Sequence, residues 1–451
     1  MERGVPAAPC FGWYGDDFTG ATDTLAALAQ AGRRALLFLD RPDAARLAAA
    51  GPLDAVGIAG AARTLDPDAM RAELAPVGRF FAGCGVRVMH YKVCSTFDSA
   101  PRVGSIGVAA AVLRPFFANP FLPVVGGQPN IGRYCLFGTL FAAAGTGGTV
   151  HRLDRHPTMT VHPVTPMTEA DLRRHLALQG LAGMAALHYP DYELDAAALD
   201  TRLDRLLADR PPAVLLDIGR AADLAVVGRL IGRQAARAPL LAIGPSGVAQ
   251  ALTAHWDADS VSRPAFPETP LAAAGGPVFV MAGSLSPVTR RQVAAAVSYQ
   301  RIRADAGRLC RDAAYAEGLR ATVAGHLRAG RHTLVWTAPA EAASAQTATV
   351  AEVAAAEVAA AEVAAATAAF AAAVLRAVPL RRVGIAGGDT SSLAVRALGC
   401  WGLSYRTALA PGVTVSRTHG DGAAADGLEL MLKGGQMGPD DLFERLLAPA
   451  A

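Results

Sequence analysis

Short β-type runs alternate with Ala- and Leu-rich helical stretches from one end of the sequence to the other. The run 11–14, for example, precedes a helical stretch at 22–31 that stops at Gly32. Further strands are expected at 87–90, 213–218, 240–243, 278–282, 333–337, 382–386 and 428–433. This alternation is typical of parallel sheets, in which a helix carries the chain back between strands. We therefore predict an α/β fold in which each domain has a largely parallel sheet flanked by helices.

The length and one proline-rich segment predict two domains. The 451 residues exceed a single ordinary domain of roughly 100 to 200 residues. Between His255 and Gly276 the pattern gives way to Ser, Pro and Ala, and prolines recur at positions 264, 267 and 270. We predict a domain at 1–262, a linker at 263–276 and a second domain at 277–451. A ligand cleft between the two domains is the expected site, since pockets often lie between domains.

The composition excludes several classes of protein. Hydrophobic residues make up 52% and charged residues 18%, and the formal net charge is only +3, which favours a compact globular protein without nucleic-acid or membrane partners. The six cysteines form no CxxC pair, so neither a disulfide framework nor a protein-bound metal site is predicted. The N-terminus lacks a signal-peptide pattern, and no apolar run is long enough to span a bilayer. We expect a soluble cytoplasmic protein.

One segment has low complexity. The pentamer Glu-Val-Ala-Ala-Ala occurs three times at 352–366, inside an Ala-rich insertion near 340–370. A five-residue period rotates by about 140° per repeat on a helix, so its valines form no single apolar stripe. We predict a surface helix with no catalytic part.

The C-terminal half contains three strand–turn–helix units with Gly- or Ser-rich turns. The turns include Gly283, Ser284 and Ser286; Gly387, Gly388, Asp389 and Thr390; and Gly434, Gly435 and Gly438. Glycines let a backbone approach phosphate oxygens closely, and free N–H groups at a helix start favour anions. The P-loop, GxGxxG and GxSxG fingerprints are absent. The three turns together predict a nucleotide site, although each alone is also a common connection between a strand and a helix in α/β proteins.

In the N-terminal half, Asp16 and Asp17 stand where a strand ends and a helix is about to begin. α/β proteins commonly bind ligands at the carboxyl ends of their parallel strands, a rim of the sheet where such residues lie. One carboxylate can orient or deprotonate a substrate hydroxyl while the other accepts a hydrogen bond or binds a metal ion. The alternative is that one of them simply caps the helix.

Other polar side chains follow nearby apolar runs. Arg63 and Lys92 lie at strand ends, where they suit a carboxylate ligand. Ser95, Thr96 and Asp98 add hydroxyl and carboxylate groups to the same rim, although a plain loop is the alternative. His162 lies in a proline-framed turn that suits either a fixed ligand contact or loop bracing.

Taken in order, these motifs resemble the four-carbon acid sugar kinase family over nearly the whole chain. The marks are Asp16 to Asp23, Lys92 with Cys94 to Ser99, His162 to Met167, Gly283 to Ser286, Gly387 to Ser391, and Lys433 to Gly438. The resemblance implies an N-terminal domain that binds a sugar acid and a C-terminal domain that binds ATP with Mg²⁺. It implies that the sugar-acid pocket is lined by Asp17, Arg63, Lys92, Ser95 and Thr96. It implies that ATP is held by Ser284, Ser286, Gly387, Gly388, Asp389, Thr390, Gly435 and Gly438.

Within the family, the 94–99 and 162–167 stretches look most like the 3-oxo-tetronate kinase branch. The chain departs from that branch at 62–64, 101–107 and 127–156, all in the substrate half. A branched acid such as 3-oxo-isoapionate is therefore the alternative substrate. A nucleotide-binding regulator without catalysis is the alternative from another class. The sequence leaves the oligomeric state open, with a homodimer as one option.

Overall fold

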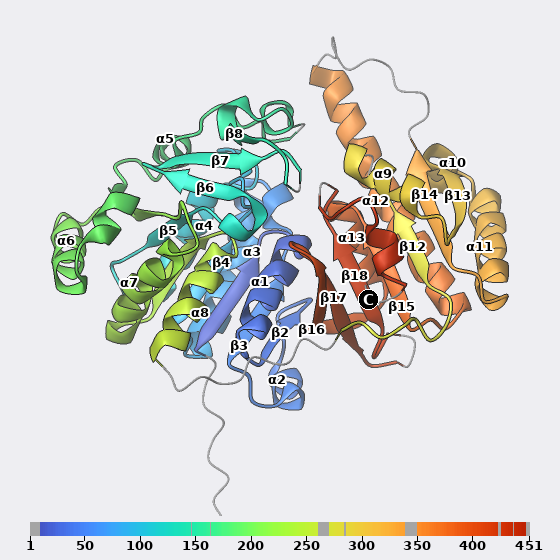
Figure 1. Cartoon of the computed structure of the whole chain (residues 1–451), viewed down its shortest axis with the longest axis horizontal. Coiled ribbons are helices and arrows are strands. Elements are labelled where there is room, and N and C mark those ends of the chain that lie inside the picture. The colour runs from blue at the N-terminus through green and yellow to red at the C-terminus, as the bar shows by residue number, and fades with distance from the viewer. Residues whose placement is uncertain are drawn as a thin grey trace, which may run out of the picture. The chain divides into compact units, whose positions relative to one another are not determined.

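The computed structural model describes residues 10–145, 147–162, 164–259, 270–283, 286–338, 350–422, 425–435 and 437–447. The chain divides into two compact units, with the boundary between residues 267 and 268. In each unit, helices flank the β-strands (Figure 1). In the part of the chain that the structure describes, no helix is both long and apolar enough to cross a membrane.

The first unit contains an eight-stranded sheet in the order β2-β3-β1-β4-β11-β5-β10-β9, and every neighbouring pair is parallel. Its strands are β1 (Phe11–Gly15), β2 (Ala35–Phe38), β3 (Ala55–Ala59), β4 (Val88–Lys92), β5 (Pro123–Gly126), β9 (Ala185–Leu187), β10 (Val214–Asp217) and β11 (Leu240–Gly244). The central β1 is fully buried, with Phe11, Trp13 and Tyr14 in the core. Such an all-apolar strand is expected where helices cover both faces of a parallel sheet.

The helices of the first unit connect these strands. They are α1 (Phe18–Gln30), α2 (Ala44–Ala50), α3 (Pro67–Gly83), α4 (Ile106–Leu113), α5 (Leu172–Ala177), α6 (Ala196–Ala208), α7 (Asp223–Arg237) and α8 (Gly247–Asp259). Helices α1, α7 and α8 lie side by side in front of the sheet, and α3 packs against α4 (Figure 1). A small antiparallel sheet of β6 (Arg133–Leu136), β7 (Thr139–Ala143) and β8 (Val150–Arg152) was not predicted.

The second unit contains a sheet in the order β13-β14-β12-β15-β18-β17-β16. Its strands are β12 (Phe279–Ala282), β13 (Gln300–Asp305), β14 (Thr333–Ala338), β15 (Arg382–Ala386), β16 (Cys400–Ala410), β17 (Val413–Gly420) and β18 (Glu429–Lys433). The strands β13, β14, β12, β15 and β18 are parallel, whereas the β16–β17 hairpin is antiparallel. The prediction of an α/β fold with largely parallel strands flanked by helices is confirmed.

The helices of the second unit are α9 (Pro287–Ala295), α10 (Ala306–Arg311), α11 (Ala313–Arg328), α12 (Val350–Ala377), α13 (Gly388–Ala397) and α14 (Leu442–Arg445). Val280, Leu334, Met431 and Phe443 are among the buried residues of its core. Parallel strands β12, β15 and β18 are neighbours, so their carboxyl ends lie together at one edge of the sheet.

The predicted linker and the repeat are described only in part. Residues 263–269 lie outside the described residues, while Leu271 is buried in the core of the second unit. The predicted domain boundaries stay a prediction. The repeat at 352–366 is helical, as predicted, within α12. Side chains before residue 362 lie outside the described set, but Ala364 and Ala368 near the end of the repeat are buried.

Candidate functional site

Three neighbouring strands of the first unit place charged residues at one edge of its sheet. Asp16 and Asp17 follow β1, Arg63 lies in a short turn after β3, and Lys92 is the last residue of β4. Arg63 forms ion pairs with both carboxylates. Its Nη2 lies 2.7 Å from Asp16 Oδ1, and its Nη1 donates to Asp17 Oδ2 at 3.0 Å. One guanidinium therefore bridges two adjacent carboxylates that would otherwise repel each other.

Asp17 also caps helix α1. Its Oδ1 accepts a hydrogen bond from the Gly20 N–H at 2.9 Å, so the capping alternative is correct and coexists with the ion pair. The predicted helix start at residue 22 was wrong, because this cap lets α1 begin at Phe18. The site is consequently built on a helix terminus whose N–H groups also favour negative charge.

The pKa values of Asp16 and Asp17 are shifted in opposite directions. Burial raises the pKa of Asp16, assisted by the Asp17 charge, although Arg63 opposes the shift. Burial also acts to raise the pKa of Asp17, but the Arg63 and Lys92 charges and the Gly20 N–H outweigh it and hold the pKa below its ordinary value. Asp17 is therefore ionised at neutral pH and is a weak base. It is better suited to orienting a hydroxyl group than to removing its proton.

Lys92 completes this cluster. Its side chain is buried, and Nζ donates to the Val93 carbonyl at 2.6 Å. A Cβ atom on Gly20 would lie 2.2 Å from Lys92 Nζ and 2.4 Å from Asp17 Oδ1. Glycine at this position thus lets the lysine and the carboxylate approach the first turn of α1.

The loop after β4 brings further predicted residues to the same strand end. Thr96 donates a hydrogen bond to Asp98 and lies 3.0 Å from Cys94 Sγ, and all three are at least half-buried. Phe97 is buried and has a φ of 56°, an uncommon value for a non-glycine residue. Burial acts to lower the pKa of Arg63, but Asp16 and Asp17 outweigh it, and Cys94 and Asp98 add to the upward shift. Ser95 lies half-buried in this loop.

His162 forms its hydrogen bonds within its own loop, and its contact with a ligand stays a prediction. Its Nδ1 accepts a hydrogen bond from the Thr165 N–H at 3.1 Å, within its own loop. Among the described residues, no hydrogen bond links His162 to Asp16, Asp17 or Arg63. The geometry supports loop bracing.

Two residues of this edge were missed from the sequence. Gln128, which follows β5, is buried and donates from Nε2 to Asp23 Oδ2 at 2.9 Å. Thr19 Oγ1, in the first turn of α1, is buried and has no hydrogen-bond partner within the described part of the chain. Buried polar atoms are nearly always paired, so this hydroxyl is available to a ligand.

The glycine turns of the second unit gather at the carboxyl ends of β12, β15 and β18. The Gly283 N–H donates to the Ala386 carbonyl at 2.9 Å, and the Gly387 N–H donates to the Lys433 carbonyl at 3.0 Å. Ser286 caps α9 through the Thr289 N–H and donates its own hydroxyl to the Gly435 carbonyl. Ser284 lies outside the described residues, as does the side chain of Asp389.

The start of α13 is open. Gly387 precedes it with a φ of 127°, a conformation that favours glycine, and none of the described side chains caps the helix. A Cβ atom on Gly388 would meet nothing within 4 Å. Thr390 reaches towards the Gly283 turn, since a Cβ on Gly283 would lie 2.4 Å from Thr390 Oγ1. Gly438, with a φ of 85°, shapes the third turn. These features fit a phosphate group near the first amides of α13.

Lys433 was not proposed as a site residue, yet it joins the first and third turns. Its buried Nζ donates to Thr289 Oγ1 at 2.9 Å, to Gln292 Oε1 at 2.7 Å and to the Gly435 carbonyl at 3.3 Å. Burial lowers its pKa to about 7. Lys92 and Lys433 are the only lysines in the sequence, every other strong base being arginine. That usage was the signal that could have identified Lys433.

The described residues contain no group of three or more His, Cys, Asp or Glu side chains arranged to hold a metal ion. The two sites therefore consist of a carboxylate–cation cluster in the first unit and a set of glycine turns with a buried lysine in the second.

Comparisons with known proteins agree with this division. A family model described as a sugar-binding N-terminal domain matches residues 11–252, and one described as a nucleotide-binding C-terminal domain matches 279–443. A 3-oxo-isoapionate kinase of Paraburkholderia graminis is 39% identical over 450 residues, covering 97% of this chain and 94% of the relative. A 3-oxo-tetronate kinase of Cupriavidus necator is 31% identical over 441 residues, covering 97% and 96%. A solved structure from Salmonella typhimurium LT2 superposes with a TM-score of 0.76 at 25% identity, covering 96% and 98%.

The fold and the domain matches define a protein that joins a sugar-binding domain to a nucleotide-binding domain. More specifically, the chain belongs to the four-carbon acid sugar kinase family. The resemblance seen in the sequence motifs is thereby confirmed.

Proposed function

We propose that the protein is an ATP-dependent kinase that phosphorylates a primary hydroxyl group of a small sugar acid. The observation that carries the proposal is the Arg63 bridge between Asp16 and Asp17, beside the buried Lys92. The kinases among the curated relatives support it. The γ-phosphoryl group would pass from ATP to the hydroxyl oxygen, giving ADP, a phosphate ester and a proton.

Phosphoryl transfer depends mostly on positioning and charge neutralisation. Asp17 would orient the acceptor hydroxyl, since its low pKa keeps it ionised. Lys92 Nζ has three donor protons and uses one on Val93, so it can also bind the carboxylate of the acid. Ser95 and Thr96 would contact the substrate from the adjoining loop. Arg63 would hold the two aspartates in place.

ATP would lie on the glycine turns, with its phosphates against the amides at the start of α13. Gly388, Thr390, Gly435 and Gly438 would form this cradle with Ser284, Ser286, Gly387 and Asp389. Mg²⁺ would neutralise phosphate charge and would be held mainly by the nucleotide, as is usual for this ion. Cytoplasmic location and a homodimer stay predictions.

A substrate panel tests the proposal. We expect the purified protein to release ADP with 3-oxo-isoapionate at a higher kcat/KM than with 3-oxo-tetronate, because the relative named for the branched acid is 39% identical and that named for the linear acid 31%. Chelation of Mg²⁺ by EDTA should stop the reaction. ATP binding without ADP release across the panel would instead indicate the regulator. No ATP binding would refute both.

A pair of glycine variants tests the phosphate cradle. Gly388→Ala should leave thermal stability unchanged, because the added Cβ meets nothing within 4 Å, but should lower ATP affinity about tenfold by blocking close approach of a phosphate. Gly387→Ala should lower both stability and affinity, because its φ of 127° disfavours any side chain. Calorimetric titration with ATP and thermal unfolding measure the two effects. Unchanged ATP affinity in Gly388→Ala would place the nucleotide elsewhere.

A further inference from the structure

A cationic pocket lies at the amino-terminal ends of β15 and β18, whereas the glycine turns lie at the carboxyl ends of these strands. Glu429 is the first residue of β18, and Arg381 immediately precedes β15. The register pairs Arg382 with Glu429 at this edge and Ala386 with Lys433 at the other. Five-residue strands separate the two edges by about 13 Å, so this pocket is distinct from the proposed nucleotide cradle.

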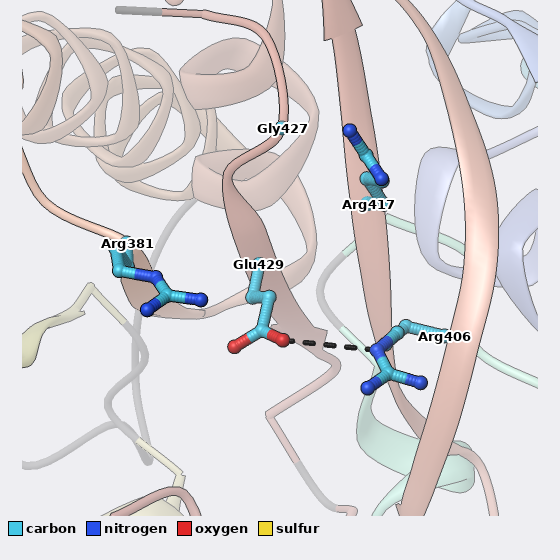
Figure 2. A pocket seen from close by; sticks show the side chains of 5 residues that line it. All are labelled: Arg381, Arg406, Arg417, Gly427 and Glu429. Atoms are coloured by element: carbon cyan, nitrogen blue, oxygen red, sulfur yellow. Dashed lines mark ion pairs between the residues drawn. The ribbon is translucent and has the colours of Figure 1, made fainter. Parts of the chain in front are cut away.

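The pocket is lined by Arg381, Arg406, Arg417, Gly427 and Glu429 and has a volume of about 480 Å³. The Glu429 carboxylate points between the guanidinium groups of Arg381 and Arg406, while Arg417 lies beside Gly427 (Figure 2). This volume falls within the range of roughly 300 to 1,000 Å³ that is usual for small-molecule sites.

Local irregularities of the sheet make room for these arginines. The register between β16 and β17 shifts between Tyr405 and Thr407, so Arg406 is the extra residue of a β-bulge. Bulges redirect a side chain at sheet edges and binding sites. Gly427, with a φ of 77°, carries no side chain, and a Cβ there would lie 3.6 Å from Arg417 Nη2.

The charges in the pocket do not balance. Glu429 is already paired with the buried Arg382, whose Nη2 lies 2.7 Å from Oε2, and its other oxygen lies 3.7 Å from Arg406. Arg382 is a structural residue, because it also donates to the Leu446 and Ala272 carbonyls. Among the described residues, Arg381 and Arg417 are exposed and have no acidic partner. Clustered like charges repel unless an anion neutralises them.

We propose that this pocket binds a small organic phosphate, as an anion site separate from both proposed substrate sites. Guanidinium groups present planar pairs of donors that match phosphate oxygens, and three of them line this pocket. The single carboxylate would position Arg406. The proposal goes beyond the kinase reaction, because the pocket shares no residue with either proposed substrate site.

The test compares a pocket variant with a control variant at an exposed arginine outside the pocket. Arg381→Ala/Arg417→Ala removes the two unpaired cations, while Arg303→Ala removes an exposed arginine from the opposite edge strand β13. Calorimetric titrations use inorganic phosphate and 3-phosphoglycerate, each with saturating ADP and 3-oxo-isoapionate present to occupy both proposed substrate sites. We expect the double variant to bind 3-phosphoglycerate at least tenfold more weakly than the wild type, and Arg303→Ala to bind it normally.

The two probes separate the sources of the anion. Tighter binding of 3-phosphoglycerate than of inorganic phosphate supports an organic phosphate, whereas equal or weaker binding overturns that assignment. The site itself is refuted if the wild type binds neither probe, or if the double variant binds as the wild type does. Both arginines are exposed, so the double variant should fold, and an unchanged thermal unfolding midpoint checks this. A failure here leaves ADP release by the wild type unaffected and so does not touch the kinase proposal.

Discussion

Asp17→Asn should lower kcat/KM for the sugar acid by about a hundred- to a thousandfold, the usual effect of removing one preorganised electrostatic group. Asparagine is also a good helix cap, so its amide oxygen can still accept the Gly20 N–H and α1 should remain intact. The variant does lose the negative charge that faces Arg63 and Lys92. ADP release under steady-state conditions measures the effect, and ATP affinity should be unchanged.

Asp43→Asn is the matched control for this variant. Asp43 caps α2 in the same unit by accepting the Arg46 N–H at 2.8 Å, but it is exposed. The same chemical change should therefore leave kcat/KM within about twofold of the wild-type value. If Asp17→Asn keeps full activity, or if both variants lose activity equally, Asp17 has no special part in the reaction.

The fold could be predicted where the chain alternates apolar runs with turns. Strands β1, β12, β15 and β18 are mostly buried runs followed by Gly or Asp, so their positions follow from hydrophobicity. The β16–β17 hairpin was missed because its strands are only partly buried and mix Ser, Thr and Arg with apolar residues. Strands of this kind are defined by their neighbours more than by their own sequence.

The sequence could predict which polar residues lie at the carboxyl ends of strands, but not how those residues contact one another. The sequence placed Asp17, Arg63 and Lys92 at strand ends, and the structure brings them together because the carboxyl ends of neighbouring parallel strands meet. Their part in substrate binding stays a prediction. That Asp17 both caps α1 and pairs with Arg63 depends on contacts across 46 residues of sequence. The Lys433 side chain is held by a hydrogen bond to Gln292, which is 141 residues away in the sequence. No local pattern reports such pairings, so their geometry had to come from the structure.

Lys433→Met should lower ATP affinity about ten- to a hundredfold. Methionine fills a similar space but donates no hydrogen bond, so Thr289, Gln292 and the Gly435 carbonyl would each lose a buried donor. An unsatisfied buried group costs about 1–3 kcal/mol. The third glycine turn would lose its bond to Lys433 and keep its bonds to Gln292 of α9 and to Ser286, the cap of that helix. Calorimetric titration with ATP measures the loss. Lys92→Met, which removes the only other lysine, is the control and should leave ATP affinity unchanged.

The pH dependence of stability distinguishes the lysine charge from its packing. Burial lowers the pKa of Lys433 to about 7, whereas a lysine in an unfolded chain has a pKa of about 10.4. Between these values the unfolded chain holds a proton that the folded chain lacks, so the lysine's contribution to the free energy of unfolding rises with pH by up to about 1.4 kcal/mol per unit. The free energy of unfolding of the wild type minus that of Lys433→Met should therefore increase from pH 7.5 to 9.5.

Urea unfolding at pH 7.5, 8.5 and 9.5 gives this difference, in which titrations common to both proteins cancel. Thr289→Ala is the matched control, because it removes one acceptor of the same cluster and keeps the lysine. Its difference from the wild type should not change with pH. A flat difference for Lys433→Met would mean that the lysine keeps an ordinary pKa in the folded protein. Lys433 would then carry a full charge beside the glycine turns at every physiological pH, and ATP affinity should be insensitive to pH across this range.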